Sequence, residues 1–349
     1  MNRLEKKMQY DHGFSSVNQN IKLNEKTIGS NITSLVYNGN YATVGLGDGR
    51  IIKIKEDENP VTLFSHKGAV TSVIFSNGNS TISAAQDGKV IKHNQDNTTQ
   101  TIFDSGEFWI NSMSFSKKTN RLAVAYDKKI LIYENQKKII DFTSPTSTLL
   151  NVSFSPNGHE LATACYNGVS IFDCQNPSSK EILSWKGSLI EASWSPDGRY
   201  VAAATQDREI HIWDFIDNKD FRLGGFIGKA RNICWTANSA YLLSLGSDVI
   251  AAWPLAGGPG NFPPVEIGYA KDASLSSVAA GGEIDKIAGG FTNGSILIGN
   301  IRNSEAIIAR APDENPITKI AWSPDYDLSL IHISEPTRRY AISYAVVGL

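Results

Sequence analysis

The stretch that decides the fold runs from Leu189 to Asp214 and reads LIEASWSPDGRYVAAATQDREIHIWD. A first apolar run ends at Trp194 and is followed by the turn sequence Ser-Pro-Asp-Gly. A second run, rich in alanine, follows at residues 200–203, and a polar segment containing Asp207 leads into a third run that ends at Trp213 and Asp214. Short apolar runs separated by turn signals indicate short antiparallel strands.

The same frame recurs along the whole chain. Further first runs begin at Ile32, Val70, Ile110, Leu149, Ala230, Leu275 and Ile317. Several second runs end in a hairpin signal that requires positive φ, namely Asp48-Gly49, Asp87-Gly88, Asn167-Gly168 and Asn293-Gly294. The spacing of about 40 residues is typical of four-stranded propeller blades. The small residues of the second runs would let neighbouring sheets approach, and stability would be a sum over sheet interfaces.

These residues resemble the WD40 repeat family. The agreement is clearest in Trp194-Ser-Pro-Asp-Gly198, Gln206-Asp207 and Ile212-Trp213-Asp214, and the resemblance covers about residues 32–325. The overall sequence pattern is similar to that of bacterial members of the family with a single propeller. The resemblance implies an all-β, WD40-like β-propeller of four-stranded blades, with seven complete repeats plus the start of an eighth. A seven-bladed ring is the alternative.

The family's structural tetrad links a His, a Ser or Thr, a turn Asp and a strand Trp by hydrogen bonds. Carried over to this sequence, the second repeat offers His66 and Asp87, while Ala85 and His93 stand at the other two positions. The fifth repeat offers Thr205, Asp207 and Trp213, while Trp185 stands where the His would be. We therefore expect no complete tetrad, and we expect apolar packing to hold the sheets together.

The resemblance divides the chain into three parts. Residues 1–31 form an N-terminal segment in which a strand near residues 17–23 would latch the ring, and residues 32–327 form the propeller, incomplete at its C-terminus. Residues 328–349 break the repeat frame. Residues 328–338 and 342–346 back-translate into strings that resemble the adapters used to prepare DNA libraries for sequencing. We therefore predict that residues 328–349 are a non-native translation of such an adapter and that the chain is C-terminally truncated.

Composition narrows the class of partner. The 349 residues include 33 Lys and Arg against 35 Asp and Glu, a formal net charge of −2, which favours neither a nucleic acid nor a membrane surface as partner. No window approaches 18 uninterrupted apolar residues, so no membrane span is expected. The three cysteines form no disulfide framework, and the six histidines show no metal-ligand spacing. We expect a cytoplasmic, monomeric scaffold without cofactor, metal or catalytic residues.

In WD40-like blades, the loop before the first strand and the turn after the second lie on one face. Aromatic and Arg side chains are common anchors of protein interfaces. The resemblance therefore predicts a protein-binding face formed by Gln86, Trp109, Tyr126, Tyr166, Trp185, Lys186, Gln206 and Arg231. Trp109 and Trp185 could instead fill the space between blades. The alternative function is a propeller hydrolase or lactonase with a metal site at the central channel, which would be assembled across blades.

Overall fold

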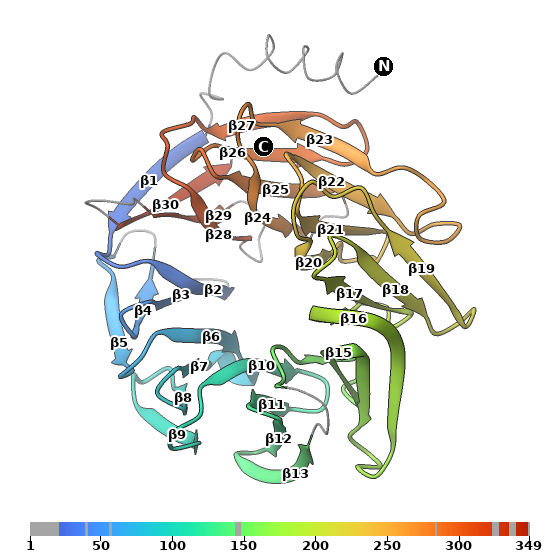
Figure 1. The fold of residues 1–349 in the computed structure, drawn as a ribbon. Coiled ribbons are helices and arrows are strands. Elements are labelled where there is room, and N and C mark those ends of the chain that lie inside the picture. Colours follow the sequence, from blue (N-terminus) through green and yellow to red (C-terminus); the bar gives the residue numbers. More distant parts are fainter. Residues whose placement is uncertain are drawn as a thin grey trace. The chain divides into compact units, whose positions relative to one another are not determined.

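The computed structural model describes residues 21–38, 41–55, 58–143, 148–282, 285–322, 328–334 and 340–347. Apart from one short 3-10 helix, Asn77–Asn79, the regular elements of these residues are β-strands. The chain divides into two compact units, the central unit of residues 32–225 and the terminal unit of residues 1–31 and 226–349. Both units consist of antiparallel sheets whose strands follow mostly in chain order (Figure 1).

The central unit begins with three four-stranded sheets, each built from consecutive strands. The first contains β2 (Ile32–Asn38), β3 (Tyr41–Leu46), β4 (Arg50–Ile54) and β5 (Val61–Ser65). The second contains β6 (Val70–Phe75), β7 (Thr81–Ala85), β8 (Lys89–His93) and β9 (Thr99–Asp104). The third contains β10 (Ile110–Ser116), β11 (Arg121–Tyr126), β12 (Lys129–Glu134) and β13 (Lys137–Thr143).

The central unit ends in a six-stranded sheet. Its strands are β14 (Ser153–Phe154), β15 (Glu160–Asp173), β16 (Lys180–Trp194), β17 (Tyr200–Thr205), β18 (Ile210–Asp214) and β19 (Lys219–Leu223). β15 and β16 have 14 and 15 residues, so each spans what the sequence pattern treats as two strands. β16 pairs with β15 through Glu181 and with β17 through Leu189, and thereby joins two repeats without a break.

The terminal unit contains three four-stranded sheets. The first contains β20 (Arg231–Trp235), β21 (Tyr241–Leu245), β22 (Val249–Pro254) and β23 (Val265–Tyr269). The second contains β24 (Leu275–Ala280), β25 (Lys286–Phe291), β26 (Ile296–Asn300) and β27 (Ala306–Arg310). The third contains β28 (Ile317–Trp322), β29 (Leu328–Ser334), β30 (Tyr340–Val347) and, from the other end of the chain, β1 (Ile21–Thr27).

The predicted count of seven complete repeats plus the start of an eighth is wrong. Among the described residues, the structure has six sheets of four strands and one sheet of six. The expected lone strand, β28, pairs with β29, β29 pairs with β30, and β30 pairs with β1, with Leu23 opposite Ala345. The foreign origin of residues 328–349 stays a prediction, because backbone pairing does not reveal where a sequence came from. Residues 17–20 of the expected latch lie outside the described residues.

A β-bulge near the start of the first strand explains why these strands do not alternate simply between buried and exposed. In β10 the register shifts between Ile110 and Ser112, and the burial pattern becomes buried, half-buried, half-buried, buried. An extra residue on one strand resets the two-residue period. The side chain at the bulge often bonds across the sheet: Thr71 Oγ1 donates to the Ala84 carbonyl (3.1 Å), and Ser276 Oγ donates to the Gly290 carbonyl (3.0 Å).

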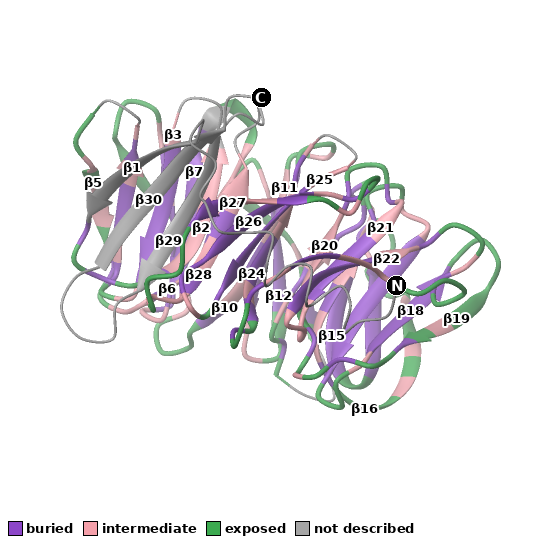
Figure 2. Cartoon of the chain, turned by 90° about the horizontal axis from the view of Figure 1, so that it is seen from above, coloured by how far each residue is buried: buried purple, intermediate pink, exposed green. Residues whose placement is uncertain are grey.

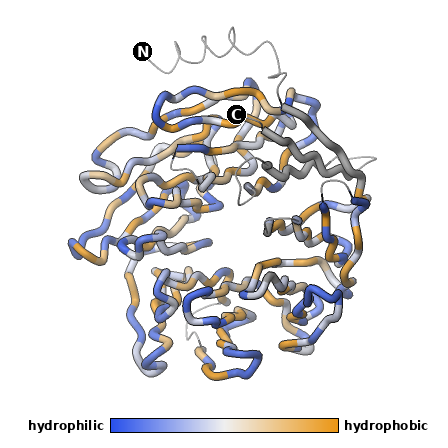
Figure 3. Tube along the Cα trace, turned by 180° about the vertical axis from the view of Figure 1, so that it is seen from behind, coloured by the Kyte–Doolittle hydropathy of each residue, from blue (hydrophilic) through white to orange (hydrophobic). Residues whose placement is uncertain are grey.

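Small residues on the second strands bring neighbouring sheets of one unit close together, as expected. A Cβ added at Gly45 would lie 2.4 Å from Val70 Cγ1, and one at Gly290 would lie 2.3 Å from Ile317 Cγ2. Ala202, Ala203 and Ala204 of β17 are fully buried. In the four-stranded sheets, burial concentrates on the second and third strands (Figure 2). Apolar segments alternate with polar turns along the chain (Figure 3).

Candidate functional site

In the central unit, the loops that lead into the first strands lie beside the turns that follow the second strands. Val70 pairs with Ala85, Ile110 with Tyr126, and Leu189 with Thr205. Backbone hydrogen bonds tie these loops and turns together, from Gln86 N to Ala69 O (2.9 Å) and from Gln206 N to Ser188 O (3.0 Å). Gln86, Trp109, Tyr126 and Gln206 therefore come from this end of their sheets. Tyr166, Trp185 and Lys186 lie inside the long strands β15 and β16, where Tyr166 pairs with Ser188 just before Leu189.

Large apolar side chains are exposed at this end of the third sheet and the adjoining part of the six-stranded sheet. Trp109 is 58% exposed and Tyr166 is 60% exposed. Sequence reasoning missed two further members, Phe108 (50%) and Leu150 (52%). The two loops are linked, since Asn111 Nδ2 donates to the Leu149 carbonyl (2.9 Å) and Leu149 N donates to the Asp127 carbonyl (2.8 Å). We call Phe108, Trp109, Leu150 and Tyr166 the apolar end patch.

Tyr126 packs against one member of this patch, Phe108. It is half-buried, and its ring centroid lies 6.2 Å from that of Phe108 and 5.1 Å from that of Phe103. Burial raises the pKa of the Tyr126 phenol, and the carboxylates of Asp141 and Asp127 add to that effect. Its role in this arrangement is to support Phe108.

Trp185 packs against its own sheet. Its ring stacks on His211 with centroids 3.9 Å apart, and His211 meets Trp213 edge-on at 4.4 Å. Burial lowers the pKa of His211, and Asp220, whose Oδ2 lies 2.9 Å from Nε2, opposes that shift. Trp185 is half-buried within its own sheet, whereas Trp109 is exposed. Lys186 and Gln206 are exposed, and Gln86 is half-buried.

The second repeat contains a buried chain of polar side chains that the sequence prediction described incorrectly. His66 Nδ1 lies 3.1 Å from both carboxylate oxygens of Asp87, as the resemblance implies. Ser83, and not Ala85, supplies the hydroxyl: its Oγ lies 2.8 Å from His66 Nε2 and 2.7 Å from His93 Nε2. Residues two apart on a strand share one face of the sheet. Ser83 and Ala85 are therefore both compatible with that face, and only the coordinates distinguish them.

The two histidines of this chain are held neutral. Burial lowers the pKa of His66, although Asp87 opposes the shift, and burial lowers the pKa of His93 to about 4. With Asp87 accepting the Nδ1 proton of His66, Nε2 of His66 accepts from Ser83, and Ser83 accepts from Nε2 of His93. The group is closed off from solvent, since Ser83 is fully buried and His93 is 3% exposed. It is a structural link within the sheet.

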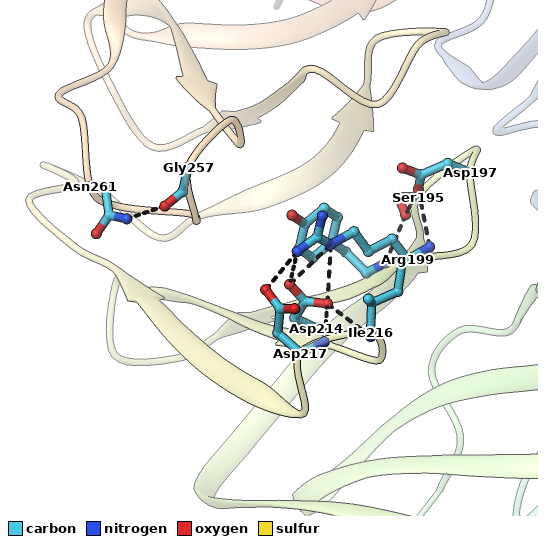
Figure 4. A network of polar contacts seen from close by, with 9 residues as sticks. Ser195, Asp197, Arg199, Asp214, Ile216, Asp217, Gly257 and Asn261 are labelled. Carbon is cyan, nitrogen blue, oxygen red and sulfur yellow. Dashed lines mark hydrogen bonds and ion pairs between the residues drawn. The ribbon is translucent and has the colours of Figure 1, made fainter.

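The fifth repeat is held differently from the predicted tetrad. Thr205 Oγ1 bonds only to the local backbone, donating to Glu209 O and accepting from Asp207 N at 3.2 Å each. Within the described residues, no hydrogen bond joins the side chains of Thr205, Asp207 and Trp213. The strong polar contact lies at the other end of β18, where Arg199 Nη2 donates to Asp214 (2.6 Å) and Asp217 (2.9 Å) (Figure 4). The Arg199 guanidinium contributes to lowering the pKa of the buried Asp214 carboxyl, against the effect of burial.

Arg231, the remaining predicted face residue, lies in the terminal unit. It is exposed and lines a pocket of about 380 Å³ together with Lys229, Asp248 and Thr292. The pocket sits where β20 begins and where β21 and β25 end. Ile227, 56% exposed, forms part of its wall.

Within the part of the chain that the structure describes, no group of three or more His, Cys, Asp or Glu side chains is placed to hold a metal ion. In the same residues, no helix is long and apolar enough to cross a membrane. Cys165, Cys174 and Cys234 are all free thiols.

Comparisons with known proteins agree with this geometry. The family model "WD domain, G-beta repeat" matches residues 58–93 and 180–214, which contain the His66–His93 chain and the Arg199–Asp214 pair. The crystal structure of the C-terminal WD40 domain of Sif2 superposes with a TM-score of 0.73 and 14% identity, covering 94% of this chain and 99% of that one. The repeated sheets and this likeness define an all-β propeller fold. The two matched segments are similar to WD40 repeats.

Curated relatives share shorter segments. The chain is 29% identical over 104 residues to "Cell division cycle 20.1, cofactor of APC complex" of Arabidopsis thaliana, covering 28% of this chain and 22% of the relative. It is 24% identical over 159 residues to the "Transcriptional corepressor LEUNIG_HOMOLOG" of the same organism, covering 43% of this chain and 20% of the relative. The chain thus matches about a fifth of the length of these relatives.

Proposed function

We propose that this chain is a non-enzymatic, monomeric scaffold that binds a protein partner in a cytoplasmic complex, and that the apolar end patch is its contact surface. The observation that carries the proposal is the exposure of Phe108, Trp109, Leu150 and Tyr166, the first three of which come from two hydrogen-bonded segments. Large exposed apolar groups on a rigid frame are typical of interaction sites. Two relatives are named as a cofactor of a complex and as a corepressor, which fits a role of this kind.

The patch combines two features of interface anchors. Trp and Tyr bury a large area and keep a polar handle, and they dominate measured interface energies. Polar side chains are also exposed in the central unit, Lys186 and Gln206 among them. The net charge of −2 favours a protein over a nucleic acid as the partner.

The test is quantitative affinity capture from the native host with Trp109→Ala plus Tyr166→Ala. The matched control is Ile216→Ala, because Ile216 is 70% exposed but follows Asp214, which pairs with Tyr200 at the opposite end of its sheet. We expect the same partner to be captured by the wild type and the control and lost from the double variant, with all three melting alike. Equal capture by the double variant would reject the patch.

A further inference from the structure

A second concave site lies between two sheets of the central unit, away from the apolar end patch. It is a pocket of about 380 Å³ between the β6–β9 sheet and the β10–β13 sheet. Its walls come from the short loop at Asn77, from β8 and from the turn between β12 and β13. The volume is in the range of pockets that bind small organic molecules.

The floor of this pocket is apolar. Ile102 and Phe115 are half-buried and pack against the core cluster that contains Ile82, Leu122 and Tyr133. A ligand seated here would cover carbon surface that is now partly open to water, so the floor favours an aromatic or branched aliphatic body.

The charge lining the pocket is positive. Lys92 is half-buried in β8, and it is the one charged side chain among the lining residues. Within the described residues no hydrogen bond or ion pair of its ammonium group is found. By contrast, Lys89 of the same strand lies 3.5 Å from Asp104, and Glu134 near the rim is already paired with Arg121 at 3.0 Å. A half-buried cation without a partner favours an anionic group on the ligand.

The rim is fixed before any ligand binds. Asn77 Nδ2 donates to Asn120 Oδ1 (3.1 Å), and Asn120 Nδ2 donates to Asn135 Oδ1 (3.0 Å). This direction of donation leaves the amide N–H groups of Asn135 as donors at the end of the chain, next to Gln136. The Tyr133 phenol, which is protonated at neutral pH, is a further donor, and burial raises its pKa to about 12. Preorganised donors lower the entropy that binding must overcome.

We propose that this pocket binds an organic carboxylate with an aromatic or branched aliphatic body, with the carboxylate on Lys92 and the body on Ile102 and Phe115. The same chemistry is offered by a free small molecule and by a peptide in which a Glu or Asp neighbours a Phe or Leu. Neither source involves the apolar end patch, so the outcome of the pocket experiment is independent of the outcome for the proposed function.

The test uses the full chain and defined probes in titrations followed by ligand-observed NMR and calorimetry. The free probes are 3-phenylpropionate and indole-3-propionate, each paired with its neutral amide, and the peptide probe is N-acetyl-Glu-Phe-amide paired with its Gln counterpart. We expect the carboxylates of one or both sources to bind at least about tenfold more tightly than their neutral partners. If only the free acids bind, or only the peptide binds, the result identifies the source of the ligand.

Variants then assign the site. Lys92→Met is expected to weaken carboxylate binding by about tenfold or more, while Lys92→Arg keeps it and Lys89→Met leaves it unchanged. Because the Lys92 ammonium group has no partner among the described residues, and the Lys89–Asp104 ion pair is exposed on both sides, all three variants should melt near the wild type. Equal binding of acids and amides, unchanged binding by Lys92→Met, or no binding of any probe would overturn the proposal.

Discussion

Replacing Ser83 by alanine tests how the polar chain of the second repeat stabilises its sheet. The substitution removes two hydrogen bonds, of 2.8 Å to His66 and 2.7 Å to His93. It also leaves the Nε2 atoms of both histidines without that partner in a buried site. A net hydrogen bond contributes about 1 kcal/mol, and each unsatisfied buried group costs about 1–3 kcal/mol. We expect Ser83→Ala to lower the free energy of unfolding by about 3 kcal/mol.

Ser244→Ala is the matched control. Ser244 lies in β21, a second strand like β7, and it is 1% exposed, but within the described residues its hydroxyl has no hydrogen-bond partner. Removing a buried hydroxyl that bonds to nothing should be neutral or slightly stabilising. Both variants would be unfolded in urea at pH 7.5 and followed by circular dichroism and tryptophan fluorescence. If Ser83→Ala loses no more stability than Ser244→Ala, the hydrogen-bonded chain does not stabilise the sheet.

Three further predictions follow from the same geometry. The pKa of His93 is about 4 in the folded chain and about 6.5 when unfolded, so the unfolded state binds more protons between these pH values. The free energy of unfolding should therefore fall by about 3 kcal/mol as the pH drops from 6.5 to 4. In denaturant titrations, His93→Gln should flatten this pH dependence. Gly290→Ala should cost about 1–3 kcal/mol by overpacking against Ile317, whereas Gly224→Ala, with open space around it, should not; unfolding curves compare them. Arg199→Ala should lower the melting temperature more than Arg222→Ala. Arg199 pairs with the buried carboxylate of Asp214, whereas Arg222, which pairs with Glu209, is itself exposed. Equal shifts in melting temperature would refute this.

The repeat and its strand order were predictable because each sheet repeats the same physical problem. A first strand needs apolar residues where it faces a neighbouring sheet, although most of its positions are only half-buried, and a second strand approached by a neighbouring sheet must have small residues. Gly45 and Gly290 show how little room remains. The count of sheets was not predictable, because the loop predicted at Trp185 and Lys186 is part of the continuous strand β16.

The site was predictable only in part. Sequence reasoning found Trp109 and Tyr166 but passed over Phe108 and Leu150. Phe108 lies two residues before the buried Ile110, and Leu150 directly follows the buried Leu149, so each looks like part of a buried apolar run. It assigned the hydroxyl position of the second repeat to Ala85 and therefore missed Ser83, which lies two residues away on the same strand face. The pocket at Lys92 had no sequence signal, since its residues come from seven separate segments that meet only when two sheets pack.

Hydrogen–deuterium exchange of the whole chain tests the central claim most directly, namely that antiparallel sheets of the same kind recur along the sequence. The account predicts slow exchange at intervals of about 40 residues in the buried second and third strands, such as β7 with β8 and β11 with β12, and faster exchange in the more exposed outer strands β9 and β13. Protection that does not recur at this interval, or that is strongest in the outer strands, would contradict it.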